Sequence, residues 1–140
     1  MPHYLVATDA DWIVAQLQAA LGGPDTTWTV CRSGRSVRTT VESASTPIDL
    51  ALVDMQIGTM GGMAVSLDLR LEESGGRAPH VRVLMLLDRS ADVFLAQRSA
   101  AEGWLIKPLD PIRLRRAART VLAGGTFTEG VPGDQHAVTG

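Results

Sequence analysis

Lys107 is the only lysine in a chain that otherwise uses arginine for its positive side chains. It follows the apolar run 104–106 and precedes Pro108, which places it at the end of a candidate strand. A lysine ammonium is a compact point charge on a flexible stem, whereas the arginine guanidinium is a wide planar fork. One ammonium at a strand end therefore fits a small, doubly charged or phosphorylated target.

Two aspartates follow other apolar runs in the same way. Asp9 comes after the run 4–8, and Asp54 comes after the run 48–53. Carboxylates that converge at strand ends repel each other, and the usual remedy is a hard divalent cation with oxygen ligands, most often Mg2+. A carboxylate beside a metal is also a nucleophile toward phosphorus, and Lys107 would neutralise the oxygens of the transferred group.

Five short apolar runs alternate with five segments of helical spacing. We expect strands at residues 4–8, 28–31, 48–53, 81–87 and 104–106, and helices at residues 11–21, 36–43, 63–73, 90–99 and 110–123. Asp11 is expected to cap the first helix, and Asp110 with Pro111 to begin the last.

This alternation favours parallel strands joined by right-handed crossovers, with helices on both faces of the sheet. The predicted fold class is α/β, a doubly wound five-stranded parallel sheet with five flanking helices. Such sheets bind ligands beyond the carboxyl ends of their strands. The rule gathers Asp9, Asp54, Leu87, Asp88 and Lys107 at one edge.

The composition fits one domain at residues 1–123 and a flexible, glycine-rich C-terminal tail at residues 124–140. A net charge of −2 gives no general attraction to nucleic acid or to an anionic membrane surface. Cys31 is the only cysteine, so no internal disulfide forms. We expect a cytoplasmic protein with neither a DNA-binding domain nor a membrane segment.

Three stretches carry a family resemblance. DLALVDMQIGTMGGMAV resembles the phosphoacceptor segment of the receiver domains of bacterial two-component response regulators, GWLIKPLDPIRL resembles their end-of-sheet segment, and LVATDADW resembles their first strand and acidic pocket. The resemblance covers residues 3–123 and implies the flavodoxin-like fold of CheY-like receivers. It implies that Asp54 is the phosphoacceptor, that Lys107 contacts the phosphoryl group, and that Mg2+ binds Asp9, Asp54 and the backbone carbonyl of Gln56. It also implies a cis Lys107–Pro108 bond.

The chain departs from the family pattern at three positions. Thr8 stands where the family has its first acid, so Mg2+ should bind more weakly unless Asp11 or Asp88 reaches in. Leu87 stands in place of a Thr or Ser and cannot hydrogen-bond a phosphoryl oxygen. Trp104 occupies the aromatic switch position with a bulkier side chain. The stretch between the last two is also short, so the fourth helix should be reduced.

Two functional interpretations follow. In the first, the chain is a stand-alone receiver, a phosphoprotein of phosphorelay signal transduction and not an enzyme. It takes a phosphoryl group from a histidine kinase or phosphotransfer protein, with Mg2+, and signals to an unidentified downstream protein. In the second, it is a phosphorylation-independent pseudo-receiver that acts as a protein interaction module. The arginine-rich last helix is either a solvated face or a docking surface, including one for a homodimer.

Overall fold

The computed structural model describes residues 2–130 of the chain. Its strands are β1 (His3–Ala7), β2 (Thr27–Cys31), β3 (Leu50–Asp54), β4 (Val83–Leu87) and β5 (Gly103–Ile106). Its helices are α1 (Asp11–Leu21), α2 (Gly34–Ser43), α3 (Gly62–Ser74), α4 (Val93–Ala96) and α5 (Pro111–Leu122), with a 3-10 turn, η1 (Ser90–Asp92), before α4.

The strands form one parallel sheet in the order β2-β1-β3-β4-β5. All residues of β1, β3 and β4 are buried, which explains why these strands appear in the sequence as continuous apolar runs. The predicted fold class is confirmed. The order places the carboxyl ends of β1, β3, β4 and β5 side by side, so residues that directly follow these strands share one edge.

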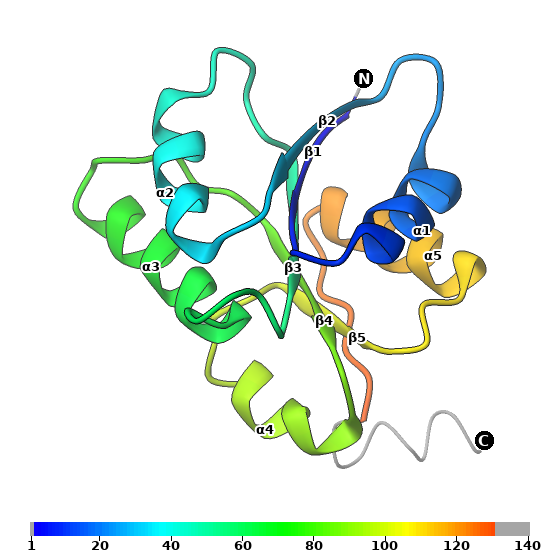
Figure 1. Ribbon diagram of the computed structural model, residues 1–140. Coiled ribbons are helices and arrows are strands. Elements are labelled where there is room, and N and C mark those ends of the chain that lie inside the picture. Colours follow the sequence, from blue (N-terminus) through cyan, green and yellow to red (C-terminus); the bar gives the residue numbers. More distant parts are fainter. Residues whose placement is uncertain (1, 131–140) are drawn as a thin grey trace.

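Helices cover both faces of the sheet (Figure 1). α1 and α5 lie on one face, over a core that includes Leu17, Leu52 and Leu114. α2, α3 and α4 lie on the other face, over a core that includes Val53 and Met85. Because successive side chains of a strand point to opposite faces, Leu52 and Val53 enter different cores.

Two expectations about the helices have opposite outcomes. α4 has only four residues after the 3-10 turn, so the predicted reduction of the fourth helix is confirmed. α1 begins at Asp11 with Ala10 at the cap position, so the prediction that Asp11 caps this helix is wrong. Asp11 lies instead in the first turn, where its carboxylate pairs with Arg32 and faces the positive end of the helix dipole.

The segment after α5 also differs from the expectation. Residues 124–130 were predicted to begin a flexible tail, but Phe127 pairs with Gly103 on the free edge of β5. The backbone of this segment therefore bonds to the sheet. Residues 131–140, the rest of the predicted tail, lie outside the described residues. Within residues 2–130, no helix is both long enough and apolar enough to cross a membrane.

Two helices, α5 and α2, begin with N-cap hydrogen bonds of different length, and this difference predicts how much each cap contributes to stability. Asp110 accepts a hydrogen bond from the Arg113 amide at 2.9 Å and begins α5, whereas Ser33 accepts one from the Ser36 amide at 3.4 Å and begins α2. We expect Asp110→Ala to lower the free energy of unfolding by about 1–2 kcal/mol, because a close carboxylate also interacts with the helix dipole. Ser33→Ala should cost less. Urea unfolding of both variants checks the ranking, and equal losses would contradict it.

Candidate functional site

Asp54 ends β3 with a carboxylate that is almost completely buried, since the residue is 2% exposed. The Thr8 hydroxyl donates to Asp54 Oδ2 at 2.7 Å. The Lys107 ammonium donates to Asp54 Oδ1 at 2.7 Å, and the Gln56 amide donates to the same oxygen at 3.2 Å. Both oxygens of this buried carboxylate therefore have donors, which is what a charge removed from water requires.

Lys107 bridges two carboxylates. Its Nζ lies 2.7 Å from Asp54 Oδ1 and 2.6 Å from Asp88 Oδ1. Burial lowers the pKa of Lys107, but hydrogen bonds and charge from Asp54 and Asp88 together outweigh burial and raise that pKa above its ordinary value. The exposed Trp12 ring lies above the pocket, with its centroid 5.9 Å from Nζ, within the range of a cation–π contact.

Asp88 enters the pocket because the loop after β4 is fixed by Asp92. Asp92 Oδ2 accepts hydrogen bonds from the amides of Asp88 and Arg89, both at 3.2 Å. Asp92 is itself buried, so it anchors the loop to the protein interior, while the Asp88 side chain points toward Lys107. Of the two acids that could compensate for Thr8, Asp88 therefore lies in the pocket, and Asp11 is paired with Arg32 instead.

The structure brings only some of the predicted metal ligands close together. Asp9 is exposed, and its Oδ2 accepts a hydrogen bond from the Gly58 amide at 3.2 Å, so it is tied to the loop after β3. Among the described residues, no group of three or more His, Cys, Asp or Glu side chains is arranged to hold a metal ion. The donors that remain, two carboxylates and the Gln56 carbonyl, are of the type that Mg2+ prefers, but they are one carboxylate short.

The two residues at the predicted switch positions, Leu87 and Trp104, are both buried. Leu87 is fully enclosed at the end of β4 and offers the pocket no hydrogen-bond donor. Trp104 is 6% exposed, packs in the same core as Met85 and Leu87, and donates its indole N–H to the Glu129 carbonyl at 2.9 Å. The contact with Glu129 could not be found from the sequence, because nothing local signals that residue 129 returns to β5.

The structure thus brings Thr8, Asp54, Asp88 and Lys107 together, with Trp12 above them. The Lys107–Pro108 peptide bond is cis, as expected. The sequence predicts no role for Trp12 in the pocket, although its place in the first turn of α1, soon after the end of β1, brings it to the same edge.

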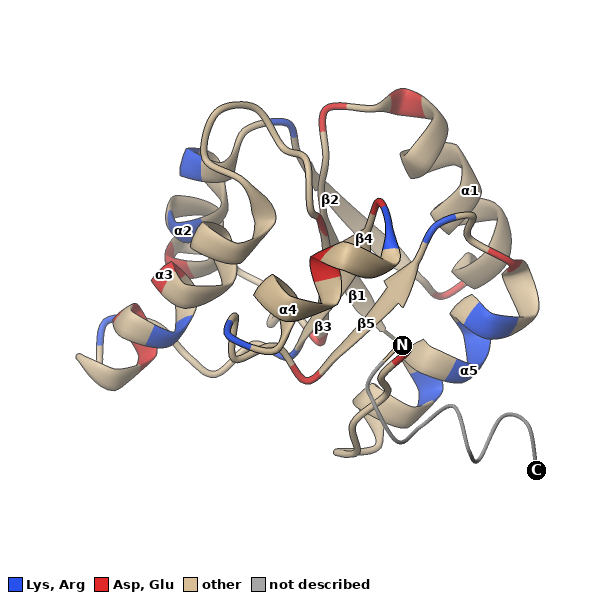
Figure 2. Ribbon diagram, turned by 90° about the horizontal axis from the view of Figure 1, so that it is seen from below, with Lys and Arg blue, Asp and Glu red and all other residues tan. Residues whose placement is uncertain are grey.

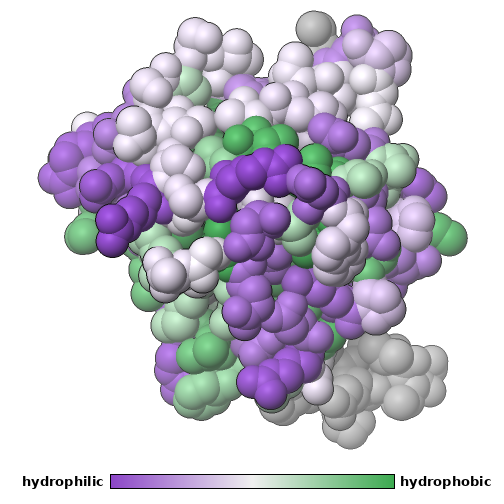
Figure 3. Space-filling view, viewed as in Figure 1, coloured by the Kyte–Doolittle hydropathy of each residue, from purple (hydrophilic) through white to green (hydrophobic). Residues whose placement is uncertain are grey.

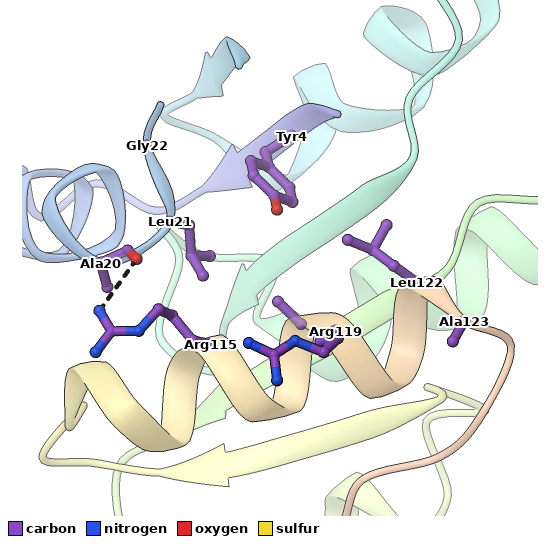
Figure 4. Close-up of a pocket in the computed structure, with 9 residues that line it drawn as sticks. Tyr4, Ala20, Leu21, Gly22, Arg115, Arg119, Leu122 and Ala123 are labelled. Atoms are coloured by element: carbon purple, nitrogen blue, oxygen red, sulfur yellow. Dashed lines mark hydrogen bonds between the residues drawn. The ribbon is translucent and has the colours of Figure 1, made fainter. Parts of the chain in front are cut away.

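The described residues also form hollows away from this pocket. One of about 510 Å3 lies between α1 and α5, with Arg115 and Arg119 at its rim and Tyr4 at its floor (Figure 4). Another, of about 340 Å3, is an apolar groove between α3 and α4, lined in part by Met60, Leu67 and Leu95. Space-filling shows hydrophobic residues exposed around α4 among hydrophilic ones (Figure 3). None of the residues that bond to Asp54 or Lys107 lines either hollow.

The fold and the pocket together define a receiver-type signalling module, and sequence comparison agrees. No family model matches the chain. Uncharacterized response regulatory proteins from two strains of Mycobacterium tuberculosis, CDC 1551 / Oshkosh and ATCC 25618 / H37Rv, are each 32% identical to it over 99 residues. The match covers 71% of this chain and 70% of each relative. The chain therefore belongs to the response regulator receiver family of two-component signalling.

Solved structures support the same fold. The Vibrio cholerae chemotaxis response regulator CheY4 superposes with a TM-score of 0.73 at 20% identity, over 86% of this chain and 98% of that one. The receiver domain of TorR, from a TMAO respiratory system, gives 0.73 at 22% identity, over 89% and 98%. The Salmonella typhimurium response regulator RcsB gives 0.71 at 12% identity and is longer, since the match covers 92% of this chain but 63% of RcsB.

The bridging lysine predicts a specific loss of stability at alkaline pH. A folded-state pKa above the unfolded value means that Lys107 stabilises the fold fully below its unfolded pKa, roughly 10.4, and progressively less as pH rises from there through the folded pKa. Lys107→Met leaves Asp54 and Asp88 without their cation, so we expect it to cost about 2–3 kcal/mol near pH 8.

Urea unfolding of both proteins from pH 8 to about pH 11.5 measures the difference between them. Tyr4, the only tyrosine, titrates in both proteins and cancels from that difference. We expect the difference to shrink above roughly pH 10.4. A difference that stays constant or grows across this range would contradict the assignment.

Proposed function

We propose that this chain receives its signal as a phosphoryl group on Asp54, transferred from the phosphohistidine of a histidine kinase or phosphotransfer protein. The observation that carries the proposal is the Lys107 ammonium held 2.7 Å from a carboxylate oxygen at the carboxyl end of β3. A carboxylate nucleophile with a fixed cation beside it is the arrangement that phosphoryl transfer to an aspartate needs. The altered state is then passed on through contacts with a downstream protein.

In this proposal the residues of the pocket have separate tasks. One oxygen of Asp54 attacks phosphorus, the bond from phosphorus to the histidine nitrogen breaks, and the imidazole leaves with that electron pair. Lys107 stays near Asp54 and neutralises the oxygens of the arriving group. Thr8 donates its hydroxyl to Oδ2 and so fixes the rotation of the carboxylate, which leaves the nucleophile oriented.

Mg2+ would be held by Asp9, Asp54 and the Gln56 carbonyl, and it would supply positive charge to the phosphoryl oxygens. Thr8 provides a hydroxyl where a third carboxylate would strengthen this set, so the proposed affinity is weak. Asp9 would have to release the Gly58 amide or use its second oxygen. The proposal places the chain in the cytoplasm with its kinase, and a homodimer through the exposed side of α5 remains a further prediction.

A second candidate function is a phosphorylation-independent pseudo-receiver. The observation that favours it is that Asp54 is already fully bonded by Thr8, Lys107 and the Gln56 amide. Asp88 adds a second bond to the same ammonium. A pocket closed in this way is stable without a metal or a phosphoryl group, and the chain would then signal by binding partners in one fixed state.

Acetyl phosphate with Mg2+ separates the two candidates. We expect the full chain to gain one phosphoryl group, seen by intact mass and by a shift on a phosphate-affinity gel, and to change its Trp12 fluorescence because that ring faces Lys107. Asp54→Asn should abolish both changes.

Asp11→Asn is the matched control, since this acid lies at the same edge but pairs with Arg32. It should be modified as the parent is. An unmodified parent, across a range of Mg2+ and phosphodonor concentrations, would remove the first candidate and leave the pseudo-receiver.

Restoring the missing acid should strengthen metal binding. In Thr8→Asp the hydroxyl that donates to Asp54 is replaced by a third carboxylate, so we expect Mg2+ affinity to rise by about ten-fold or more. Fluorescence titration with Mg2+ measures it. Thr8→Asn keeps the size and polarity without the charge, and should show no such rise. Equal affinity in parent and Thr8→Asp would show that these residues do not form a metal site.

A further inference from the structure

Residues 126–130, here called the strap, run along the free edge of β5 (Figure 1). The Trp104 amide donates to the Phe127 carbonyl at 2.8 Å, and the Phe127 amide donates to the Glu102 carbonyl at 3.3 Å. The Trp104 indole N–H donates to the Glu129 carbonyl at 2.9 Å. The strap therefore satisfies donors that an edge strand otherwise presents to solvent or to another chain.

The side chain of Glu129 completes the attachment. Its Oε1 accepts a hydrogen bond from the Ile106 amide at 2.9 Å, where the backbone carbonyl of a longer strand would otherwise bond. Its two oxygens also take a bidentate ion pair with Arg113, in which Nε lies 2.7 Å from Oε2 and Nη2 contacts Oε1. Paired arginine–carboxylate hydrogen bonds of this kind are both strong and specific in direction.

The edge of β5 is shaped for this close approach. A Cβ atom added at Gly103 would lie 2.5 Å from the Phe127 carbonyl oxygen, so only glycine lets the strap lie flat here. At the start of the segment, Gly124 has a φ of +93°, a conformation that glycine adopts without strain. The short turn after α5 thus places the strap beside the edge of β5.

The donor that holds the Glu129 carboxylate, the Arg113 guanidinium, is positioned independently of the strap. Arg113 also donates to the Pro108 carbonyl at 3.0 Å and to the Ile106 carbonyl at 3.1 Å, which fixes its guanidinium at the end of β5. It lies on the first turn of α5, a helix that carries further arginines (Figure 2). With the strap absent, this edge would present two backbone amides, an indole N–H and an oriented guanidinium.

We propose that the edge of β5, with Arg113, is a docking site for an extended acidic peptide of a partner protein, and that the strap occupies this site in cis and restricts access to it. The strap itself shows the chemistry that the site selects, which is an extended backbone that adds to the sheet and one carboxylate placed to reach both the Ile106 amide and Arg113. Addition of an extended peptide to a sheet edge is a general mode of recognition. The proposal does not depend on phosphorylation of Asp54.

Because the strap belongs to the same chain as the site, a partner must bind more tightly than the strap to displace it. A segment tethered through the end of α5 has an effective concentration on the order of millimolar, so a short peptide free in solution competes poorly with it. The contacts are nevertheless few, and the Glu129 side chain is partly exposed. A partner that offers the same carboxylate and more contacts would displace the strap.

The test uses the full chain with Glu129→Ala, observed by NMR at the Ile106 amide and the Trp104 indole N–H. We expect both signals to leave their wild-type positions. The Ile106 amide loses its acceptor, the Glu129 carboxylate, and the Trp104 indole N–H bonds to a backbone carbonyl that this carboxylate no longer holds in place. A synthetic peptide with the sequence of residues 124–130 should then restore both signals. Its affinity for the variant should exceed that for the wild-type chain by about ten-fold or more.

Matched variants identify the site. The same peptide with Gln in place of its Glu should bind about ten-fold more weakly, and Arg113→Ala in the Glu129→Ala chain should abolish restoration, whereas Arg116→Ala should not. Gly103→Ala alone should displace the strap by a steric clash and should also block the peptide, because the added Cβ would clash with the backbone of either segment. This variant keeps the test decisive if Glu129→Ala does not fold.

Three outcomes would overturn the proposal. Unchanged Ile106 and Trp104 signals in both Glu129→Ala and Gly103→Ala would show that the strap is not held as described. Displaced signals that the peptide does not restore would show that the edge is not a peptide site. Concentration-dependent association of Glu129→Ala, without an effect of the peptide, would assign the edge to a second copy of the chain.

Discussion

A single ammonium between two carboxylates determines how the carboxyl edge of this sheet is organised. Asp54 and Asp88 follow neighbouring strands, β3 and β4, and would repel each other if they faced one another without a cation. Lys107, at the end of the next strand, lies within 2.7 Å of one and 2.6 Å of the other. Removing one partner of such a group leaves a charge buried without compensation, which is far more costly than the net value of the intact pair. The loops after β3, β4 and β5 are therefore held together by one side chain.

Thr8 changes the character of this pocket more than its size suggests. A carboxylate at this position would add a negative charge beside Asp54 and so increase the repulsion that a metal ion relieves. The hydroxyl instead donates to Asp54 and adds no further negative charge to the two carboxylates that Lys107 bridges. The same substitution that weakens the proposed metal site thus makes the unmodified pocket self-sufficient. Leu87 also favours an unmodified pocket. Its buried apolar side chain occupies the end of β4, where a hydroxyl could instead hydrogen-bond a group added to Asp54.

The fold and the centre of the pocket were predictable because both depend on local pattern. Buried parallel strands are continuous apolar runs, so the positions of Asp54 and Lys107 at strand ends followed from the sequence, and strand order brought them together. Whether Asp88 or Asp11 reaches into the pocket stayed open from the sequence, because the position of Asp88 depends on how Asp92 fixes a loop. The strap was missed for a different reason. Glycine and small polar residues are typical of flexible tails, and its attachment rests on Glu129 meeting Arg113 and a strand edge, which local composition does not encode.

The pocket and the edge of β5 are linked through consecutive residues of one strand. Backbone amides of a strand alternate in direction, so the Ile106 amide faces Glu129 while the next amide, that of Lys107, donates to the Leu87 carbonyl at 2.8 Å. The ammonium that contacts Asp54 and the amide that donates to Glu129 therefore belong to consecutive residues, Lys107 and Ile106. The Lys107 amide thus ties this residue to β4, while the amide of the residue before it donates to Glu129 on the other side of the strand. A charge gained or lost at Asp54 acts on Lys107 directly, and the backbone of Lys107 adjoins the residue whose amide donates to the strap.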